Sequence, residues 1–162
     1  MQATLTIDYS QKMRMKALFA LLTSTARVTV LRVFLLDPLR SYYQRQIEMA
    51  TGLPIRAIQR ELERLSSAGL IHRRAEGNRT YYQVDMHFPL FPELRGMILK
   101  ASDDVDALRG ALALEEAVQL LFLADTRDRA LVVVRPGRRW SPPGKNSIAM
   151  EVMTSEEFLR AL

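Results

Sequence analysis

The sequence contains no cysteine and only two histidines among its 162 residues. Without cysteine the chain cannot form disulfides, thiolate zinc sites or thiol-based sensors. A metal site needs three or four converging ligands, and His72 and His87 stand on either side of a predicted hairpin. We therefore expect neither a metal nor a cofactor. The absence of cysteine also fits a reducing, cytoplasmic setting.

Long apolar runs are missing as well. The most apolar stretch, residues 17–36, is interrupted by three consecutive hydroxyl residues and by Arg27 and Arg32, which is too polar for a bilayer span. The N-terminus lacks the apolar core of a signal peptide. Hydrophobic residues still make up 48% of the chain and charged residues 25%. We therefore expect a globular protein with no membrane partner.

The positive charge is unevenly distributed along the chain. Residues 1–100 hold 15 Lys and Arg against 8 Asp and Glu, whereas residues 101–162 hold 8 against 10. A basic first part and a slightly acidic second part indicate that only the first meets a polyanion. No helix shows the division into basic and bulky apolar faces that binding to a membrane surface requires.

Apolar spacing and stop signals predict an α+β protein. Gly52 and Gly69 end two predicted helices, and Pro54 suits the first turn of the helix between them. The predicted helices cover residues 13–22, 26–36, 44–51, 54–68, 93–101 and 103–114, with a last one capped by Ser155. The predicted strands cover residues 41–43, 70–74, 80–84, 118–123, 131–134 and 148–153, with residues 75–79 as a hairpin turn.

The order helix, helix, hairpin around Gly52 is typical of a winged helix-turn-helix. In such a fold the second helix buries one stripe and presents its other face to the major groove of double-stranded DNA. The stripe is formed by Ile55, Ile58, Leu62 and Leu65. The opposite side carries Arg56, Ala57, Gln59, Arg60 and Arg64. Arg56, Gln59 and Arg60 lie where base edges are within reach, because Arg pairs with guanine and Gln with adenine. We expect Arg64 to contact phosphate.

The hairpin and the first short helix add further candidate DNA contacts. Arg73, Arg74, Asn78 and Arg79 belong to the hairpin, whose small tip fits a minor groove. Tyr42, Tyr43, Gln44 and Arg45 open the first short helix and are expected to donate to phosphates. The alternating charges of RELER are, taken alone, more typical of a solvated helix face. The combination in this order favours DNA binding.

The segment LPIRAIQRELERLSSAGLIHRRAEGNRTYYQVD resembles the recognition helix and wing of ArsR-like winged-helix transcription regulators. The resemblance covers roughly residues 18–100. It implies DNA binding by a regulator, of the repressor type. Family members that sense metals use cysteines or clustered His and carboxylates, which this chain lacks.

The segment NRTYYQVDMHFPLFPELRGMILKA resembles the connection between a winged helix and a minimal nucleotidyltransferase domain. The following stretch, VQLLFLADTRDRALVVV, departs from that domain. It has no Gly-Ser motif after its first strand and no aspartate pair on its second. We interpret Asp125 and Asp128 as turn residues, so the second part is expected to be a degenerate, non-enzymatic domain.

A single recognition helix contacts only a few base pairs. We therefore expect a homodimer that binds two half-sites. The dimer interface has two candidate locations, which are the first predicted helix and the helix around residues 94–112. The first helix would supply Met13, Met15, Leu18, Leu21 and Leu22. Trp140 in the basic loop of residues 135–146 either caps the small core or anchors a small-molecule or protein effector at the C-terminal domain.

The sequence thus predicts a DNA-binding domain over residues 13–88, a linker or dimerisation helix over 89–114 and a small α/β domain over 115–162. The expected function is a non-enzymatic, homodimeric transcription regulator that binds double-stranded operator DNA. Two alternatives stay open: a nucleotidyltransferase with unusual ligands, and a module that uses the same basic surface to bind protein or RNA.

Overall fold

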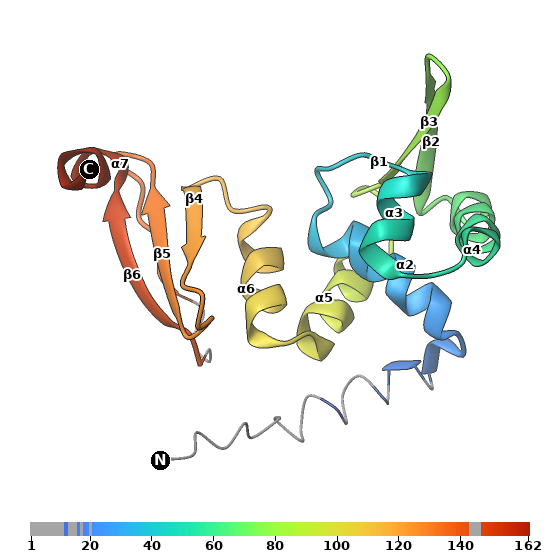
Figure 1. Ribbon diagram of the computed structural model, residues 1–162, viewed down its shortest axis with the longest axis horizontal. Coiled ribbons are helices and arrows are strands. Elements are labelled where there is room, and N and C mark those ends of the chain that lie inside the picture. Colours follow the sequence, from blue (N-terminus) through green and yellow to red (C-terminus); the bar gives the residue numbers. More distant parts are fainter. Residues whose placement is uncertain (1–11, 13–15, 17, 20, 143–146) are drawn as a thin grey trace. The chain divides into compact units, whose positions relative to one another are not determined.

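The structure is a computed structural model that describes residues 12, 16, 18, 19, 21–142 and 147–162. The predicted helix over residues 13–22 therefore lies largely outside the described residues, as do Met13 and Met15. The chain divides into two compact units, Met1–Asp103 and Asp104–Leu162. The described part holds six helices and two three-stranded sheets, so the fold is α+β as predicted (Figure 1).

The four described helices of the first unit begin within two residues of the predicted positions and end within one. They are α2 (Thr25–Leu36), α3 (Gln44–Thr51), α4 (Ile55–Ser67) and α5 (Phe91–Ala101). Ser24 caps α2 with its hydroxyl oxygen, which accepts from the backbone N–H of Arg27 at 3.1 Å. Gly52 ends α3 with a left-handed φ of 66° and donates to the carbonyl of Glu48. Pro54 stands at the cap of α4, one position earlier than predicted.

The sheet of the first unit consists of β1 (Tyr42–Tyr43), β2 (Ile71–Glu76) and β3 (Arg79–Val84), in the order β1-β3-β2. Both neighbouring pairs are antiparallel, and Glu76 pairs with Arg79. The turn therefore contains only Gly77 and Asn78, shorter than the predicted loop over 75–79. Gly77 adopts a φ of 60°, which explains why glycine stands there.

The core of the first unit is formed where α2, α3, α4 and α5 meet the base of the hairpin. Its largest fully buried side chains are Phe34, Leu31, Leu35, Ile47, Ile58, Leu62 and Ile98. The predicted stripe of α4 is confirmed for Ile58, Leu62 and Leu65. It is wrong for Ile55, which is 36% exposed. Ile55 is the first residue of α4 and borders an open hollow next to α3 and the hairpin turn instead of the core.

The second unit contains α6 (Asp104–Leu112), β4 (Val118–Leu123), β5 (Arg129–Val134), β6 (Ala149–Thr154) and α7 (Ser155–Ala161). Its sheet has the order β4-β5-β6, with β4 antiparallel and β6 parallel to the central β5. The predicted cap Ser155 is wrong by one position. Thr154 caps α7, because its hydroxyl accepts from Glu157 N–H at 3.2 Å and Glu157 accepts from Thr154 N–H at 2.8 Å.

The two helices of the predicted linker over 89–114 belong to different cores. Phe91 and Ile98 of α5 are buried in the first core, whereas Leu108 and Leu112 of α6 are buried with Val132, Val134 and Ile148. The division therefore falls between residues 103 and 104, not at 88 and 114. Trp140 packs against the second core. Within the described residues, no helix is long and apolar enough to span a bilayer.

Candidate nucleic-acid interface

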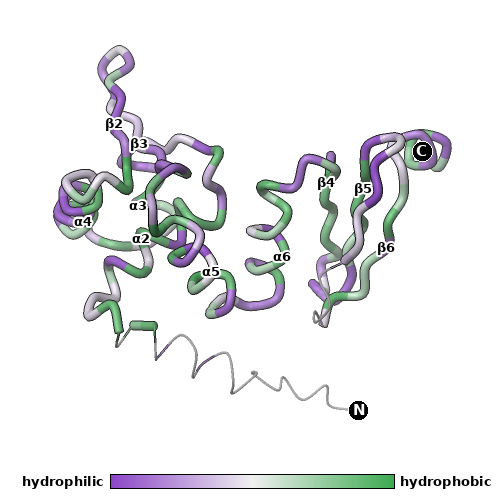
Figure 2. Tube along the Cα trace, turned by 180° about the vertical axis from the view of Figure 1, so that it is seen from behind, coloured by the Kyte–Doolittle hydropathy of each residue, from purple (hydrophilic) through white to green (hydrophobic). Residues whose placement is uncertain are grey.

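The outward face of α4 carries the side chains that the sequence predicts as base readers. Burial of Ile58, Leu62 and Leu65 fixes the rotation of the helix about its axis. That rotation leaves Arg56, Gln59 and Arg60 exposed and Ala57 half-buried. Figure 2 shows the hydrophilic colouring of α4 and of the hairpin. The predicted base readers of α4 therefore lie on its solvent-facing side.

A buried carboxylate holds α4 against α2. Glu61 is 4% exposed and accepts from Arg27 Nε at 3.0 Å and from Arg64 Nη1 at 3.1 Å. The charge alternation in RELER predicts a solvated face and does not reveal this network. Glu61 lies three residues after Ile58 and four before Leu65, so it shares the buried side of the helix. This spacing is the sequence signal from which the burial of Glu61 could have been predicted. Arg64, a predicted phosphate contact, is thus paired within its own helix, although 61% of its side chain is exposed.

The hairpin presents its predicted cations to solvent. Arg73, Arg74, Asn78 and Arg79 are all exposed, and the hairpin extends beyond the helices of its unit (Figure 1). Arg74 Nη2 donates to Glu76 at 3.1 Å. The Arg79 guanidinium lies 4.7 Å above the centre of the Tyr43 ring, which also meets Tyr81 edge-to-face at 5.9 Å. The cation nearest the tip is therefore supported by aromatic rings.

Two open hollows connect the hairpin with the helices. The first, of about 390 Å³, lies between the start of α3 and the hairpin tip. Its lining includes Tyr43, Gln44, Arg45, Ile55, Asn78 and Arg79. The second, of about 760 Å³, lies between α4 and the hairpin. Its lining includes Gln44, Gln59, Glu63, His72, Arg73 and Tyr82. Gln44 borders both hollows, so the predicted contacts from α3, α4 and the hairpin adjoin one another there.

Other predicted residues lie outside these hollows. Arg56, Ala57, Arg60 and Arg64 of α4 and Arg74 of β2 line neither of them. Tyr42 is buried, with its ring edge-to-face against Phe34 at 5.5 Å, so the prediction that it donates to phosphate is wrong. At the start of α3 the backbone N–H of Tyr43 donates to Gln46 Oε1 at 3.1 Å. Only the later N–H groups of that first turn therefore remain for an anion.

Both histidines of the chain contact one carboxylate at the base of the hairpin. His72 Nε2 lies 3.0 Å from Asp85 Oδ2, and His87 Nδ1 lies 3.4 Å from Asp85 Oδ1. The backbone N–H of His87, followed by the two imidazoles, holds the pKa of Asp85 below its usual value. No described group of three or more His, Cys, Asp and Glu side chains is arranged to hold a metal. The sequence did not single out Asp85, which links β2 to the segment after β3.

The acidic pair of the second unit lies in the turn between β4 and β5. Asp125 and Asp128 are both exposed there, and the Thr126 hydroxyl donates to Asp128. The backbone carbonyl of Asp128 accepts from Ala149 N–H at 2.8 Å. The described contacts of Asp128 are thus those of a turn residue, as expected from the sequence.

Positive charge dominates the surface formed by α3, α4 and the hairpin. It carries Arg45, Arg56, Arg60, Arg64, Arg73, Arg74 and Arg79, against the exposed or half-exposed acids Glu48, Glu63 and Glu76. In the part of the chain that the structure describes, carboxylates pair with Arg64 and Arg74 but not with Arg45, Arg56, Arg60, Arg73 or Arg79. We call this set of seven arginines with Gln44, Gln59 and Asn78 the basic face.

No protein-family model matches the sequence, and neither a curated protein nor a solved structure matches the chain.

Proposed function

We propose that the first unit is a winged helix-turn-helix that binds double-stranded DNA in a sequence-specific manner, and that the protein is a transcription regulator. The observation that carries the proposal is the basic face. Its arginines come from three elements, α3, α4 and the hairpin, and five of them have no carboxylate partner among the described residues. A polyanion with phosphates on both sides of a groove is the partner that such a surface fits.

In the proposal, the side chains of α4 read base edges, whereas the hairpin and the start of α3 contact the backbone and the minor groove. In the proposal α4 enters the major groove, where exposed Arg56, Gln59 and Arg60 reach base edges. The hairpin follows the backbone and the minor groove, with Arg79 held in place by the Tyr43 ring. Gln44 and Arg45 at the start of α3 then contact phosphates, which fix the register of the protein on the duplex.

The proposed protein acts as a homodimer, because one recognition helix reads too few base pairs for an operator. The family resemblance favours repression. The residues predicted for the first seam give limited support to it. Of those described, Leu18 is buried in the core of its own chain, Leu22 packs against that core, and only Leu21 is fully exposed.

The test begins with selection of bound duplexes from a random pool, followed by binding measurements on selected and random DNA. Arg60→Ala is expected to weaken binding to the selected sequence by roughly 1–3 kcal/mol, concentrated at one base position, because Arg60 reads a base. Arg79→Ala is expected to weaken binding to both DNAs alike. It should also lower the slope of log K against log salt by about 0.9, the contribution of one phosphate contact.

Arg127→Ala is the matched control, because Arg127 is an exposed arginine of the second unit that lies outside both candidate dimer seams. It should leave both measurements unchanged. Equal losses on selected and random DNA for Arg60→Ala would remove its role as a base reader. Enrichment of no duplex at moderate salt, with retention of RNA or of a protein by the same basic face, would overturn the proposal in favour of those partners.

A further inference from the structure

One edge strand of the sheet in the second unit lacks the charged residues and prolines that usually protect an edge. The two edge strands are β4 and β6. Natural edges carry charged side chains or proline, which prevent pairing with another strand. β6 has Glu151 at its middle, whereas β4 reads VQLLFL and contains neither a charge nor a proline. The register of β4 shifts between Val118 and Leu120, and the regular stretch from Leu120 to Leu123 is an edge without charge or proline.

Some backbone N–H and C=O groups of β4 point away from β5, toward the outer edge of the sheet. The N–H of Ala124 donates to the carbonyl of Arg129 across the antiparallel pair at 3.0 Å. In an antiparallel pair alternate residues bond to the neighbouring strand. Phe122 therefore bonds toward β5, and Leu121 and Leu123 direct their N–H and C=O groups to the outer edge. Among the described residues no strand pairs with that edge.

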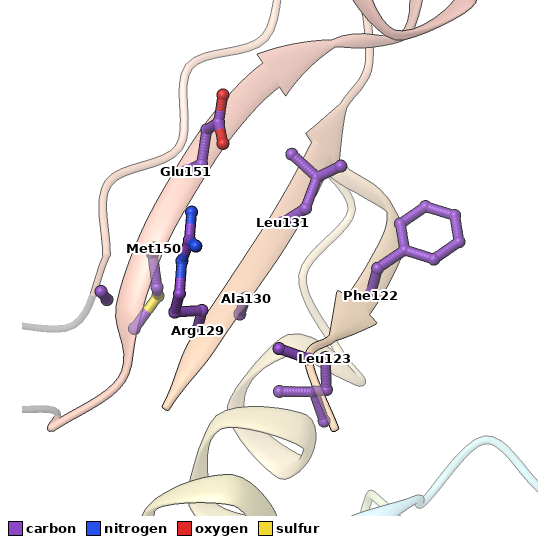
Figure 3. A pocket seen from close by; sticks show the side chains of 9 residues that line it. Phe122, Leu123, Arg129, Ala130, Leu131, Met150 and Glu151 are labelled. Atoms are coloured by element: carbon purple, nitrogen blue, oxygen red, sulfur yellow. The ribbon is translucent and has the colours of Figure 1, made fainter. Parts of the chain in front are cut away.

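The same strand exposes large apolar side chains on one face of the sheet. Leu120 and Phe122 are 44% and 45% exposed, and Leu159 of α7 is 69% exposed. The Phe122 ring stacks on Phe158 of α7 with centroids 5.4 Å apart. Figure 3 shows Phe122 and Leu131 at a hollow on this sheet, where Arg129 and Glu151 also lie. The volume of the hollow is about 480 Å³. An apolar surface thus adjoins the unpaired backbone, and one occupant could cover both.

We propose that β4 pairs in antiparallel fashion with β4 of a second copy of this chain, which joins the two sheets into one of six strands. Centring the twofold axis on Leu121 places the regular stretch of β4, which begins at Leu120, at the seam. The backbone N–H and C=O groups of Leu121 then bond to those of the partner's Leu121 across the axis. Leu120 lies opposite the partner's Phe122. The apolar side chains that are exposed in one chain cover each other in the pair.

The charge pattern explains why a second copy fits β4 and not β6. Residues near a twofold axis meet their own copies or close neighbours, so a charge there meets a like charge. β6 paired about its middle would bring Glu151 close to its copy, which is unfavourable. The middle of β4 consists of Leu120, Leu121 and Phe122 and carries no charge. This pairing does not depend on DNA binding by the first unit.

The experiment measures the mass of the full-length protein in solution over a range of concentrations. The wild type is expected to form a dimer. Leu120→Lys places an ammonium group at the seam and should raise the dimer dissociation constant by about tenfold or more. Val152→Lys is the matched control, because Val152 is 38% exposed on the opposite edge strand, and it should remain dimeric. Circular dichroism of both variants checks that they are folded.

A cysteine variant tests the register directly, because the natural chain contains no cysteine. Leu121→Cys should form a disulfide-linked dimer under mild oxidation, whereas Val152→Cys should stay monomeric on a denaturing gel. A monomeric wild type would overturn the proposal. So would a folded Leu120→Lys variant that is still a dimer with unchanged affinity, or equal crosslinking of the two cysteine variants.

Discussion

The two three-stranded sheets of this protein expose opposite chemistry at their edges. In the first unit the edge strand β2 carries Arg73, Arg74 and Glu76, all exposed, and it stays in contact with water. In the second unit the edge strand β4 carries no charge and exposes Leu120 and Phe122. Charged edges resist pairing with other strands, and uncharged edges invite it. The two proposals rest on this difference, with a polyanion as partner of the first surface and a further strand as partner of the second.

Each of the two sheets is supported by its own core. Phe34→Ala should lower the free energy of unfolding of the first unit by about 3–5 kcal/mol, because the ring is fully buried among α2, β1 and their neighbours. Leu108→Ala should destabilise the second unit by about 2–5 kcal/mol. Amide hydrogen exchange, resolved by segment, measures both effects in the full chain.

Each substitution should accelerate exchange mainly in its own unit. For Phe34→Ala the strands β2 and β3 should lose protection while β5 keeps it, and Leu108→Ala should give the reverse pattern. Equal loss of protection in both units after either substitution would show that the two cores unfold as one.

A smaller loss of stability is expected when the buried carboxylate that links α4 to α2 loses its charge. Glu61→Gln should lower the free energy of unfolding by about 1–3 kcal/mol, because Arg27 and Arg64 lose their charged acceptor at a largely buried site. Glu63→Gln, on the exposed side of the same helix, should change it by less than about 0.5 kcal/mol. Urea unfolding measures both, and similar values for the two variants would contradict a special role for Glu61.

The smallest expected effect concerns pH and the base of the charged hairpin. The pKa of Asp85 lies below its usual 3.8, chiefly because the carboxylate accepts from the backbone N–H of His87. A lowered folded-state pKa stabilises the fold above pH 3.8, and this contribution is lost as the pH falls through the folded-state pKa.

Asp85→Asn cannot ionise, so the difference in unfolding free energy between wild type and variant should be constant near neutral pH. It should shrink as the pH drops below 3.8. Urea titrations over that range give the difference directly. A difference that grows toward acid pH would contradict the assigned direction.

Local signals in the sequence predicted most of the secondary structure. Gly52 and Pro54 placed the boundaries of α3 and α4 to within a residue, since they act through their own backbone geometry. Apolar spacing identified Ile58, Leu62 and Leu65 as buried and the arginines between them as exposed. The candidate site on α4 and the hairpin could therefore be predicted from residue types and their spacing alone.

Other features could not be read from local patterns. The contact of Glu61 with Arg27 joins residues of two different helices. The stacking of Arg79 on Tyr43 joins the hairpin to the start of α3. The assignment of α5 and α6 to different cores depends on which apolar faces meet. Such contacts depend on how elements far apart in the chain pack together. The sequence gives the residue types but not which of them meet.

The sequence by itself determined the elements, the excess of arginine in the first part and the lack of cysteine, because each of these follows from residue identity and short-range spacing. Only the tertiary structure decided that Tyr42 and Glu61 turn inward, that Asp85 stands between both histidines, and that β4 ends up at an edge. Strand order and side-chain burial arise when distant segments compete for the same core, and no single segment encodes that outcome.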